Sequence, residues 1–177
     1  HEYLQKNGFV LFPQTWNISA YRYLMSTSAF LNATAVSAFL ATVGTGLSLL
    51  FTATMGFGLS RKRLRGRRII MMMVLLTILF NPGIIPNYLV VRELGLINSI
   101  WSLIIPVLIS GWNLILMKSF FDNIPAELEE SAMIDGCNDL GTFFRIIMPL
   151  SAAALAAFGL FYAVGYWNTF FHAVLYI

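Results

Sequence analysis

Four long apolar runs, none of which contains an Asp, Glu, Lys or Arg, constrain the fold of this chain more than any other feature. A helix of about 20 apolar residues crosses a bilayer core of about 30 Å. A helix of a soluble protein would expose a charged stripe instead, and only 11% of this chain is charged. We therefore predict an all-α integral membrane protein, a polytopic helical bundle with one transmembrane domain over residues 1–177. The expected spans are 29–59, 69–91, 97–117 and 146–165.

The positive charge of the chain predicts which side of the membrane each loop occupies. Six of the 11 Lys and Arg residues fall between Arg61 and Arg68, in the short hinge between the first two spans. Because cytoplasmic loops carry an excess of Lys and Arg, this hinge is expected in the cytoplasm. Residues 118–145 then lie inside and residues 1–28 form an extracytoplasmic lead-in. The basic charge is explained by topology, so no nucleic-acid partner is expected.

The start of the chain, its cysteine and its histidines add little evidence on function. The sequence begins with His1, and residues 1–28 lack a signal-peptide pattern, which suggests a piece of a longer protein, truncated at both ends. Cys137 is the only cysteine, so no disulfide forms within the chain. With only His1 and His172 as histidines, the sequence offers no metal site, catalytic residue or cofactor site.

Small residues and prolines predict how the spans pack and bend. Gly44, Ser48, Thr52 and Gly56 recur at every fourth position, which lets another helix approach closely in lipid; the alternative is that this helix lines a pore. Asn81-Pro82-Gly83 interrupts the second span, and such breaks are tolerated where protein or water satisfies the freed backbone groups. We expect a kink there, beside a cavity.

Three residues are candidates for a substrate path. A neutral ligand such as a sugar is held by amide groups and flat aromatic faces, and Asn81, Trp112 and Asn113 offer both. The alternative is that the aromatic side chain is an interfacial anchor at the end of a span.

Residues 123–141, which we call the elbow, are predicted to form two short helices joined at a glycine. Pro125 suits a first helical position, and Glu127 and Glu129 complement the positive end of the helix dipole. Gly136 can adopt the left-handed conformation that ends a helix, and Asn138 or Asp139 can cap the second helix. Such an acidic elbow suits a groove on another protein, although a solvated connecting loop remains the alternative.

The elbow and the residues that follow it carry the pattern Glu130-Ser131-Ala132, Gly136, Ile146 and Met148-Pro149. This pattern resembles the signature loop of ABC transporter permeases that work with a substrate-binding protein. In the family, alanine is usual where Ser131 stands and leucine where Met148 stands, both conservative departures. The flanking phrases Ile124 to Glu130 and Ile134-Asp135-Gly136 look like the carbohydrate branch of maltose and oligosaccharide type.

The resemblance implies a permease subunit of an ATP-driven importer for sugars or oligosaccharides, multi-pass in the plasma (inner) membrane. Family members have six spans, so the four here would be the second to fifth. The implied partners are cytoplasmic ATP-binding subunits, a second homologous permease, an extracytoplasmic solute-binding protein and membrane lipid. The elbow would be a cytoplasmic helix-turn-helix coupling loop. The implied ATPase-coupling residues are Glu129, Glu130, Ser131, Ala132, Asp135, Gly136, Ile146 and Pro149.

Other functions are considered beside this one. No phosphate-binding GxxxxGK[ST] loop is present, so the resemblance assigns ATP hydrolysis to a partner chain and the protein is expected to be no enzyme. Permeases for amino acids or peptides carry the same loop and remain an alternative. A secondary transporter would show inverted repeats and ionisable residues within its spans, and neither is found.

Overall fold

The computed structural model describes residues 18–177, and within this range every regular element is a helix. The predicted all-α fold is confirmed for these residues. The chain divides into two compact units, residues 1–36 and 37–177. The part of the predicted lead-in at residues 1–17 lies outside the described residues.

The first unit contains α2 (Ser19–Ser26) and the beginning of α3 (Ser28–Phe39). Between them Thr27 has an extended backbone, with φ of −85° and ψ of 122°. Its N–H still bonds to the Leu24 carbonyl at 3.1 Å, so the helix ends with one orphan group satisfied. The extracytoplasmic placement of residues 1–28 stays a prediction.

One helix is long and apolar enough to cross a membrane, and it runs from Ser28 to Ser60. It joins α3, the π-helical turn η1 (Leu40–Gly44) and α4 (Thr45–Ser60). Two further pairs of helices qualify only if each bent pair counts as one span, with bends of 49° and 83°. By length and composition, residues 18–177 thus hold one to three spans, and the four-span layout stays a prediction.

The region predicted as the second span consists of two helices, α5 (Arg67–Leu79) and α6 (Ile84–Glu93). Between them the Asn81 side chain accepts a hydrogen bond from the Gly83 N–H at 3.0 Å. Gly83 has φ of +83°, which favours glycine. The break expected at Asn81-Pro82-Gly83 is confirmed, whereas the cavity expected beside it stays a prediction.

The second half of the chain alternates longer helices with sharp bends. The pair bent by 49° is η2 and η3 with α7, and the pair bent by 83° is α9 to α10 with α11. The elements are η2 (Ile100–Leu103), η3 (Ile105–Val107), α7 (Gly111–Asp122), α8 (Ala126–Ile134), α9 (Asp139–Thr142), η4 (Phe143–Ile147), α10 (Met148–Leu150), α11 (Ala152–Trp167) and α12 (Phe170–Tyr176). Pro149 lies in the bent segment, as the sequence predicts.

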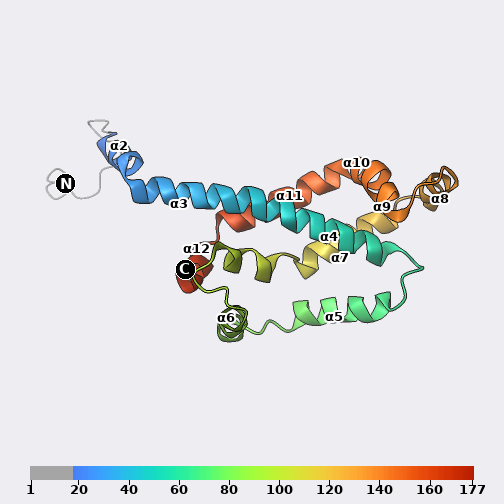
Figure 1. The fold of residues 1–177 in the computed structure, drawn as a ribbon, viewed down its shortest axis with the longest axis horizontal. Coiled ribbons are helices and arrows are strands. Elements are labelled where there is room, and N and C mark those ends of the chain that lie inside the picture. Colours follow the sequence, from blue (N-terminus) through green and yellow to red (C-terminus); the bar gives the residue numbers. More distant parts are fainter. Residues whose placement is uncertain (1–17) are drawn as a thin grey trace, which may run out of the picture. The chain divides into compact units, whose positions relative to one another are not determined.

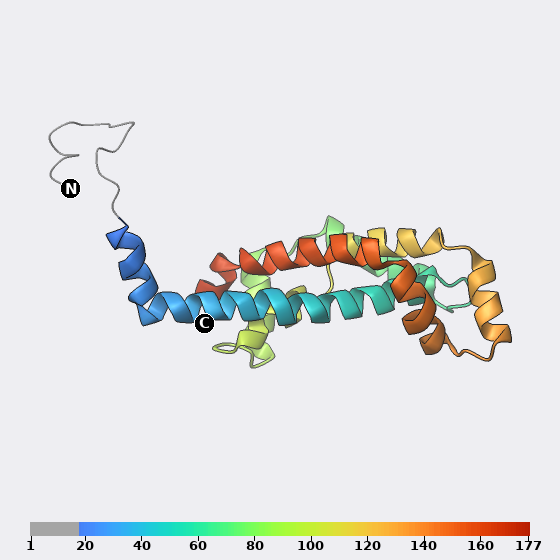
Figure 2. The ribbon, with the colours of Figure 1, turned by 90° about the horizontal axis from the view of Figure 1, so that it is seen from above.

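In the second unit, α4 packs against both α7 and α11 (Figures 1 and 2). Small residues of α4, together with Gly44 at the end of η1, make close helix contacts. Gly44, Ser48, Thr52 and Gly56 are all buried, with Gly44 facing Tyr166 of α11 and Gly56 facing Met117 of α7. Close packing of this kind holds helices together in lipid, where apolar burial alone supplies little driving force. The packing face predicted from the four-residue spacing is confirmed.

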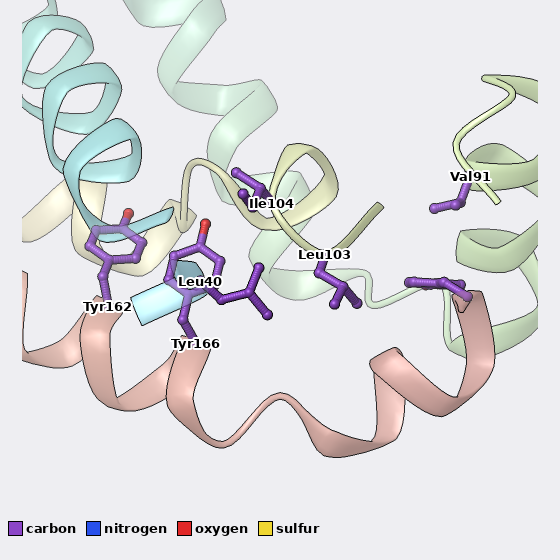
Figure 3. Close-up of a cluster of buried hydrophobic side chains, with 7 residues drawn as sticks. Leu40, Val91, Leu103, Ile104, Tyr162 and Tyr166 are labelled. Atoms are coloured by element: carbon purple, nitrogen blue, oxygen red, sulfur yellow. The ribbon is translucent and has the colours of Figure 1, made fainter. Parts of the chain in front are cut away.

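Two clusters of buried side chains hold this unit together. The first, drawn in Figure 3, gathers residues from η1, α6, η2, α11 and α12: Leu40, Val91, Leu103, Ile104, Tyr162, Tyr166 and Tyr176. The second gathers residues from α4, α7, η4 and α11: Ala53, Phe57, Met117, Phe121, Phe143, Ile147 and Phe158. The second cluster brings the end of α4 beside the helix that leaves the elbow, and so fixes where the elbow begins and ends.

Candidate functional site

The elbow is built from α8 and α9, which meet at a left-handed glycine. Pro125 precedes α8 with an extended backbone, and Glu127 and Glu129 lie in the first turn. At the other end Gly136 has φ of +82°, and the Cys137 N–H bonds to the Ala132 carbonyl at 2.9 Å. A residue with a β-carbon is disfavoured at this φ, so the glycine fixes the turn between the two arms.

The second arm starts with a side-chain cap. Asn138 accepts a hydrogen bond from the Gly141 N–H at 2.7 Å, which satisfies a free donor of the first turn of α9. Of the two caps that the sequence allowed, the structure uses Asn138. Pro125 likewise takes the position before the first helical residue, one place earlier than predicted.

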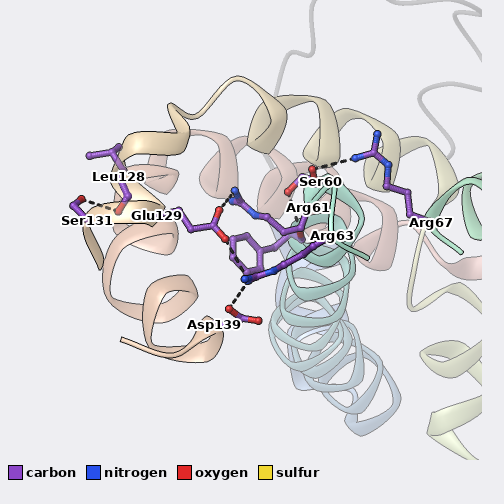
Figure 4. A network of polar contacts seen from close by, with 9 residues as sticks. Ser60, Arg61, Arg63, Arg67, Leu128, Glu129, Ser131 and Asp139 are labelled. Atoms are coloured by element: carbon purple, nitrogen blue, oxygen red, sulfur yellow. Dashed lines mark hydrogen bonds and ion pairs between the residues drawn. The ribbon is translucent and has the colours of Figure 1, made fainter. Parts of the chain in front are cut away.

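An ionic cluster joins the elbow to the hinge after α4 (Figure 4). Arg61 pairs with Glu129 of α8, and Arg63 pairs with both Glu129, at 3.3 Å, and Asp139 of α9. The Arg61 and Glu129 side chains are only 15% and 12% exposed, whereas Arg63 and Asp139 are 50% and 62% exposed. We call these four residues the arginine clamp. Its inner pair is shielded from water, so its attraction is screened less than that of the outer pair.

Aromatic rings support the inner pair. The Arg61 guanidinium lies 4.3 Å from the ring centroid of Phe57, which is a cation–π contact. Phe57 in turn packs against Phe121 and Phe143, with ring centroids 6.2 and 5.1 Å apart. Arg61 therefore contacts both the second buried cluster, through Phe57, and α8, through Glu129.

The predicted coupling residues do not all face the same way. Glu129 points inward to the arginine clamp, and Ala132 is buried at 3% exposure. Glu130, Asp135 and Gly136 are exposed. The Ser131 hydroxyl is also exposed and donates to the Glu127 carbonyl of its own helix at 2.8 Å. Glu130 on α8 and Asp135 at its C-terminal end make no ion pair within residues 18–177, and we call them the free acidic face of α8.

The last two predicted coupling residues lie beyond the elbow. Ile146 is half-buried in η4 and Pro149 is exposed in α10. They lie on the bent path from the elbow into α11.

A cavity of about 500 Å³ is lined by residues of α6, η2, η3, the start of α7, α11 and α12. None of its lining residues is Asp, Glu, Lys or Arg. They are Asn87, Ser102, Leu103, Pro106, Val107, Ser110, Asn113, Phe161, Tyr162, Gly165, Tyr166, Asn168, Thr169, His172 and Tyr176. Amides, hydroxyls and aromatic faces together can hold a polar, hydroxyl-rich ligand.

Of the three predicted substrate-path residues, only Asn113 lines this cavity. Asn81 bonds to its own loop, and Trp112 is 63% exposed on the outer side of α7. The structure therefore brings one of the three to the cavity and leaves the other two apart from it.

Two tyrosines of α11 tie the cavity wall to α4. The Tyr162 hydroxyl lies 2.7 Å from Thr52 Oγ1 and accepts from the Ser110 N–H at 3.1 Å. The Tyr166 hydroxyl lies 2.8 Å from Ser48 Oγ. The sequence analysis did not identify these tyrosines. The signal available in the sequence was that Tyr162 and Tyr166 are four residues apart, as are their partners Thr52 and Ser48.

The chain matches known transport proteins. Residues 48–177 match the family model described as binding-protein-dependent transport system inner membrane component. Protein LplC of Bacillus subtilis is 49% identical over 98% of this chain and 59% of its own length. The polygalacturonan/rhamnogalacturonan transport system permease protein YtcP of the same organism is 51% identical over 96% of this chain and 59% of its own length.

A solved structure has the same fold. It is a chain of a bacterial ABC transporter involved in the import of the acidic polysaccharide alginate, with a TM-score of 0.93 and 34% sequence identity. The match covers 99% of this chain and 63% of that chain. The present chain thus spans about three fifths of the length of the proteins it resembles.

Proposed function

Since the chain belongs to the family of binding-protein-dependent transport system inner membrane components, we propose that it is part of the permease subunit of an ATP-driven importer of oligosaccharides. The proposed subunit crosses the inner membrane several times. ATP hydrolysis takes place on partner chains, and the permease supplies the pathway.

The observation that carries this proposal is the free acidic face of α8. Glu130 of α8 and Asp135, the residue that ends this helix, are exposed, whereas Ala132 is buried and Glu129 is held by Arg61. A helix anchored on one side and free on the other can insert into a groove of a second protein. We propose that Glu130, Ser131, Asp135 and Gly136 contact the cytoplasmic ATP-binding subunits, while Ile146 and Pro149 shape the path from the elbow into α11.

The spans predicted from the sequence complete this arrangement. We propose that segments 29–59, 69–91, 97–117 and 146–165 cross the membrane and that the elbow lies in the cytoplasm. Closure of the ATP-binding subunits displaces the elbow, and the attached helices switch the pathway between inward-open and outward-open states. A second homologous permease and an extracytoplasmic solute-binding protein are the remaining partners.

The proposed solute class is supported by the relatives and by the cavity. One relative is named for polygalacturonan and rhamnogalacturonan, and the solved neighbour imports alginate. The cavity offers Asn113, Asn168 and Thr169 to sugar hydroxyls. It has no Asp or Glu in its lining, so no carboxylate repels an acidic sugar.

The test uses the complete transporter in proteoliposomes, with oligogalacturonides, alginate oligosaccharides, amino acids and dipeptides as candidate solutes. We expect uptake of an oligosaccharide that amino acids and dipeptides do not inhibit. We expect E130K to keep its membrane insertion but to lose uptake per ATP hydrolysed by about tenfold. The matched control is E93K, because Glu93 is an exposed glutamate of another helix, α6, and lies outside the elbow. Normal coupling in E130K would overturn the assignment of the elbow, and uptake of amino acids alone would overturn the solute class.

A further inference from the structure

The end of α4 has no covalent connection to the elbow near the site where they touch. The chain enters the elbow from α7 and leaves it through η4, α10 and α11. The last residue of α4 is Ser60, and 63 positions separate it from Asn123 at the start of the elbow. Any motion of the elbow therefore reaches α4 through side-chain contacts, and the arginine clamp supplies the polar ones.

The contacts of the inner pair, Arg61 and Glu129, favour a single arrangement of the two side chains. Arg61 Nε and Nη2 are buried and make no hydrogen bond within residues 18–177, so Glu129 is the only carboxylate that compensates the charge of this guanidinium. The ring of Phe57 occupies the face of the guanidinium at 4.3 Å. A buried charge whose partner moves away is left uncompensated, which is strongly unfavourable. Moving α8 away from the end of α4 therefore costs free energy, because it leaves the Arg61 charge unpaired.

Arg63 makes ion pairs with both arms of the elbow. Arg63 contacts Glu129 on α8 and Asp139 on α9, which lie on either side of the Gly136 turn (Figure 4). One guanidinium therefore bridges both arms of the elbow. Since Arg63 follows the end of α4 by three residues, the same bridge ties both arms to that helix.

We propose that Arg61, Arg63 and Glu129 are positioning residues that make the elbow and the cytoplasmic end of α4 one rigid body. This inference rests on the proposed function. The two adjacent glutamates then have different roles: Glu129 forms ion pairs within the chain, and Glu130 contacts the ATP-binding subunit. A displacement of the elbow by the ATP-binding subunits then moves α4 directly, in addition to α7 and α11.

The experiment measures a distance inside this body in the assembled transporter. Spin labels replace Lys62, beyond α4, and Ala126, the first residue of α8; both positions are exposed. Cys137 and any further cysteine of the complete protein are replaced first. Double electron–electron resonance then gives the label distance without nucleotide and with ATP and vanadate trapped. We expect the same distribution in both states.

Charge reversal tests whether the arginine clamp is what keeps the label distance constant. In R61E and in E129R we expect a broader distribution that shifts by about 2–5 Å between the states, the scale of helix displacements at packed interfaces. We expect R61E/E129R to restore the narrow, state-independent distance. The matched control is R68E, since Arg68 is an exposed arginine with no ion pair in the described part of the chain. If R61E fails to assemble, R61Q and E129Q replace the reversed pair.

Two results would overturn the inference: a distance that changes between states in the unreversed protein, or single reversals that leave it narrow and constant. The proposed function fails in a different way, because ATP-binding subunits would then not co-purify with the unreversed protein. Co-purification together with a mobile label pair would leave the proposed function standing and remove only the rigid body.

Discussion

The ring of Tyr166 covers Gly44 so closely that a β-carbon at position 44 would lie 2.8 Å from Tyr166 Cζ. The ring has no room to withdraw, because Tyr166 is 4% exposed and its hydroxyl is bonded to Ser48 at 2.8 Å. The contact therefore sets how closely α11 approaches the span that contains Gly44. An ordinary side chain at this position must separate the two helices.

Gly44→Ala is the smallest change that tests this contact. Overpacking of a rigid core costs about 1–3 kcal/mol, which exceeds the gain of about 1 kcal/mol from placing alanine in a helix. We expect a lower thermal unfolding midpoint for the purified protein in detergent. Gly46→Ala is the control, because nothing lies within 4 Å of its added β-carbon, and its midpoint is expected to stay level or rise. An equal response of the two variants would contradict the packing argument.

Tyr162→Phe tests the hydroxyl that joins three helices. The change removes the bond to Thr52 and leaves the Ser110 N–H without its acceptor. An unsatisfied buried polar group costs about 1–3 kcal/mol, so the unfolding midpoint should fall. Tyr176→Phe is the matched control, since Tyr176 is also buried but its hydroxyl makes no hydrogen bond within residues 18–177. A control variant as unstable as Tyr162→Phe would show that the loss is general.

Local patterns in the sequence were sufficient for the helical class, the packing face and the elbow. The four-residue spacing of Gly44, Ser48, Thr52 and Gly56 matches the helical repeat, so it places these side chains on one face without further information. Gly136 likewise marks a turn because few other residues adopt its φ. Each of these features depends on residues that lie near one another in the chain.

Contacts between distant segments were not predictable in the same way. The run from Arg61 to Arg68 was explained by membrane topology, which accounts for its charge but not for a partner. Arg61 meets Glu129 only because Phe57, Phe121 and Phe143 bring the end of α4 beside the elbow. The cavity was missed for a related reason. Asn113 follows the bend between η3 and α7, and Asn168 ends α11, so no spacing rule predicts that the two residues line one cavity.

Substitutions of Gly136 can show whether this position requires a left-handed backbone or only a small side chain. Gly136→Asn keeps access to the left-handed region, whereas Gly136→Val does not, and a β-carbon there costs about 1–2 kcal/mol. No atom lies within 4 Å of an added β-carbon, so within the chain the strain comes from φ alone. We expect Gly136→Asn to retain the coupling of ATP hydrolysis to uptake in proteoliposomes and Gly136→Val to lose most of it. Equal losses would indicate that a partner protein excludes any side chain at this position.

The two carboxylates of the arginine clamp differ in burial, and their neutral variants should differ in stability. Glu129→Gln leaves the 15%-exposed Arg61 without a carboxylate, and breaking a shielded pair of this kind costs about 3 kcal/mol. Asp139→Asn removes a pair whose side chains are 50% and 62% exposed, which is worth about 0–1 kcal/mol. We expect thermal unfolding in detergent to show a large decrease for the first variant and little change for the second. Raising the salt concentration should narrow the small difference between Asp139→Asn and the unsubstituted protein, while the deficit of Glu129→Gln persists, because a pair shielded from water is screened less. A deficit of Glu129→Gln that disappears in high salt would show that Arg61 and Glu129 are open to solvent, against the burial seen here.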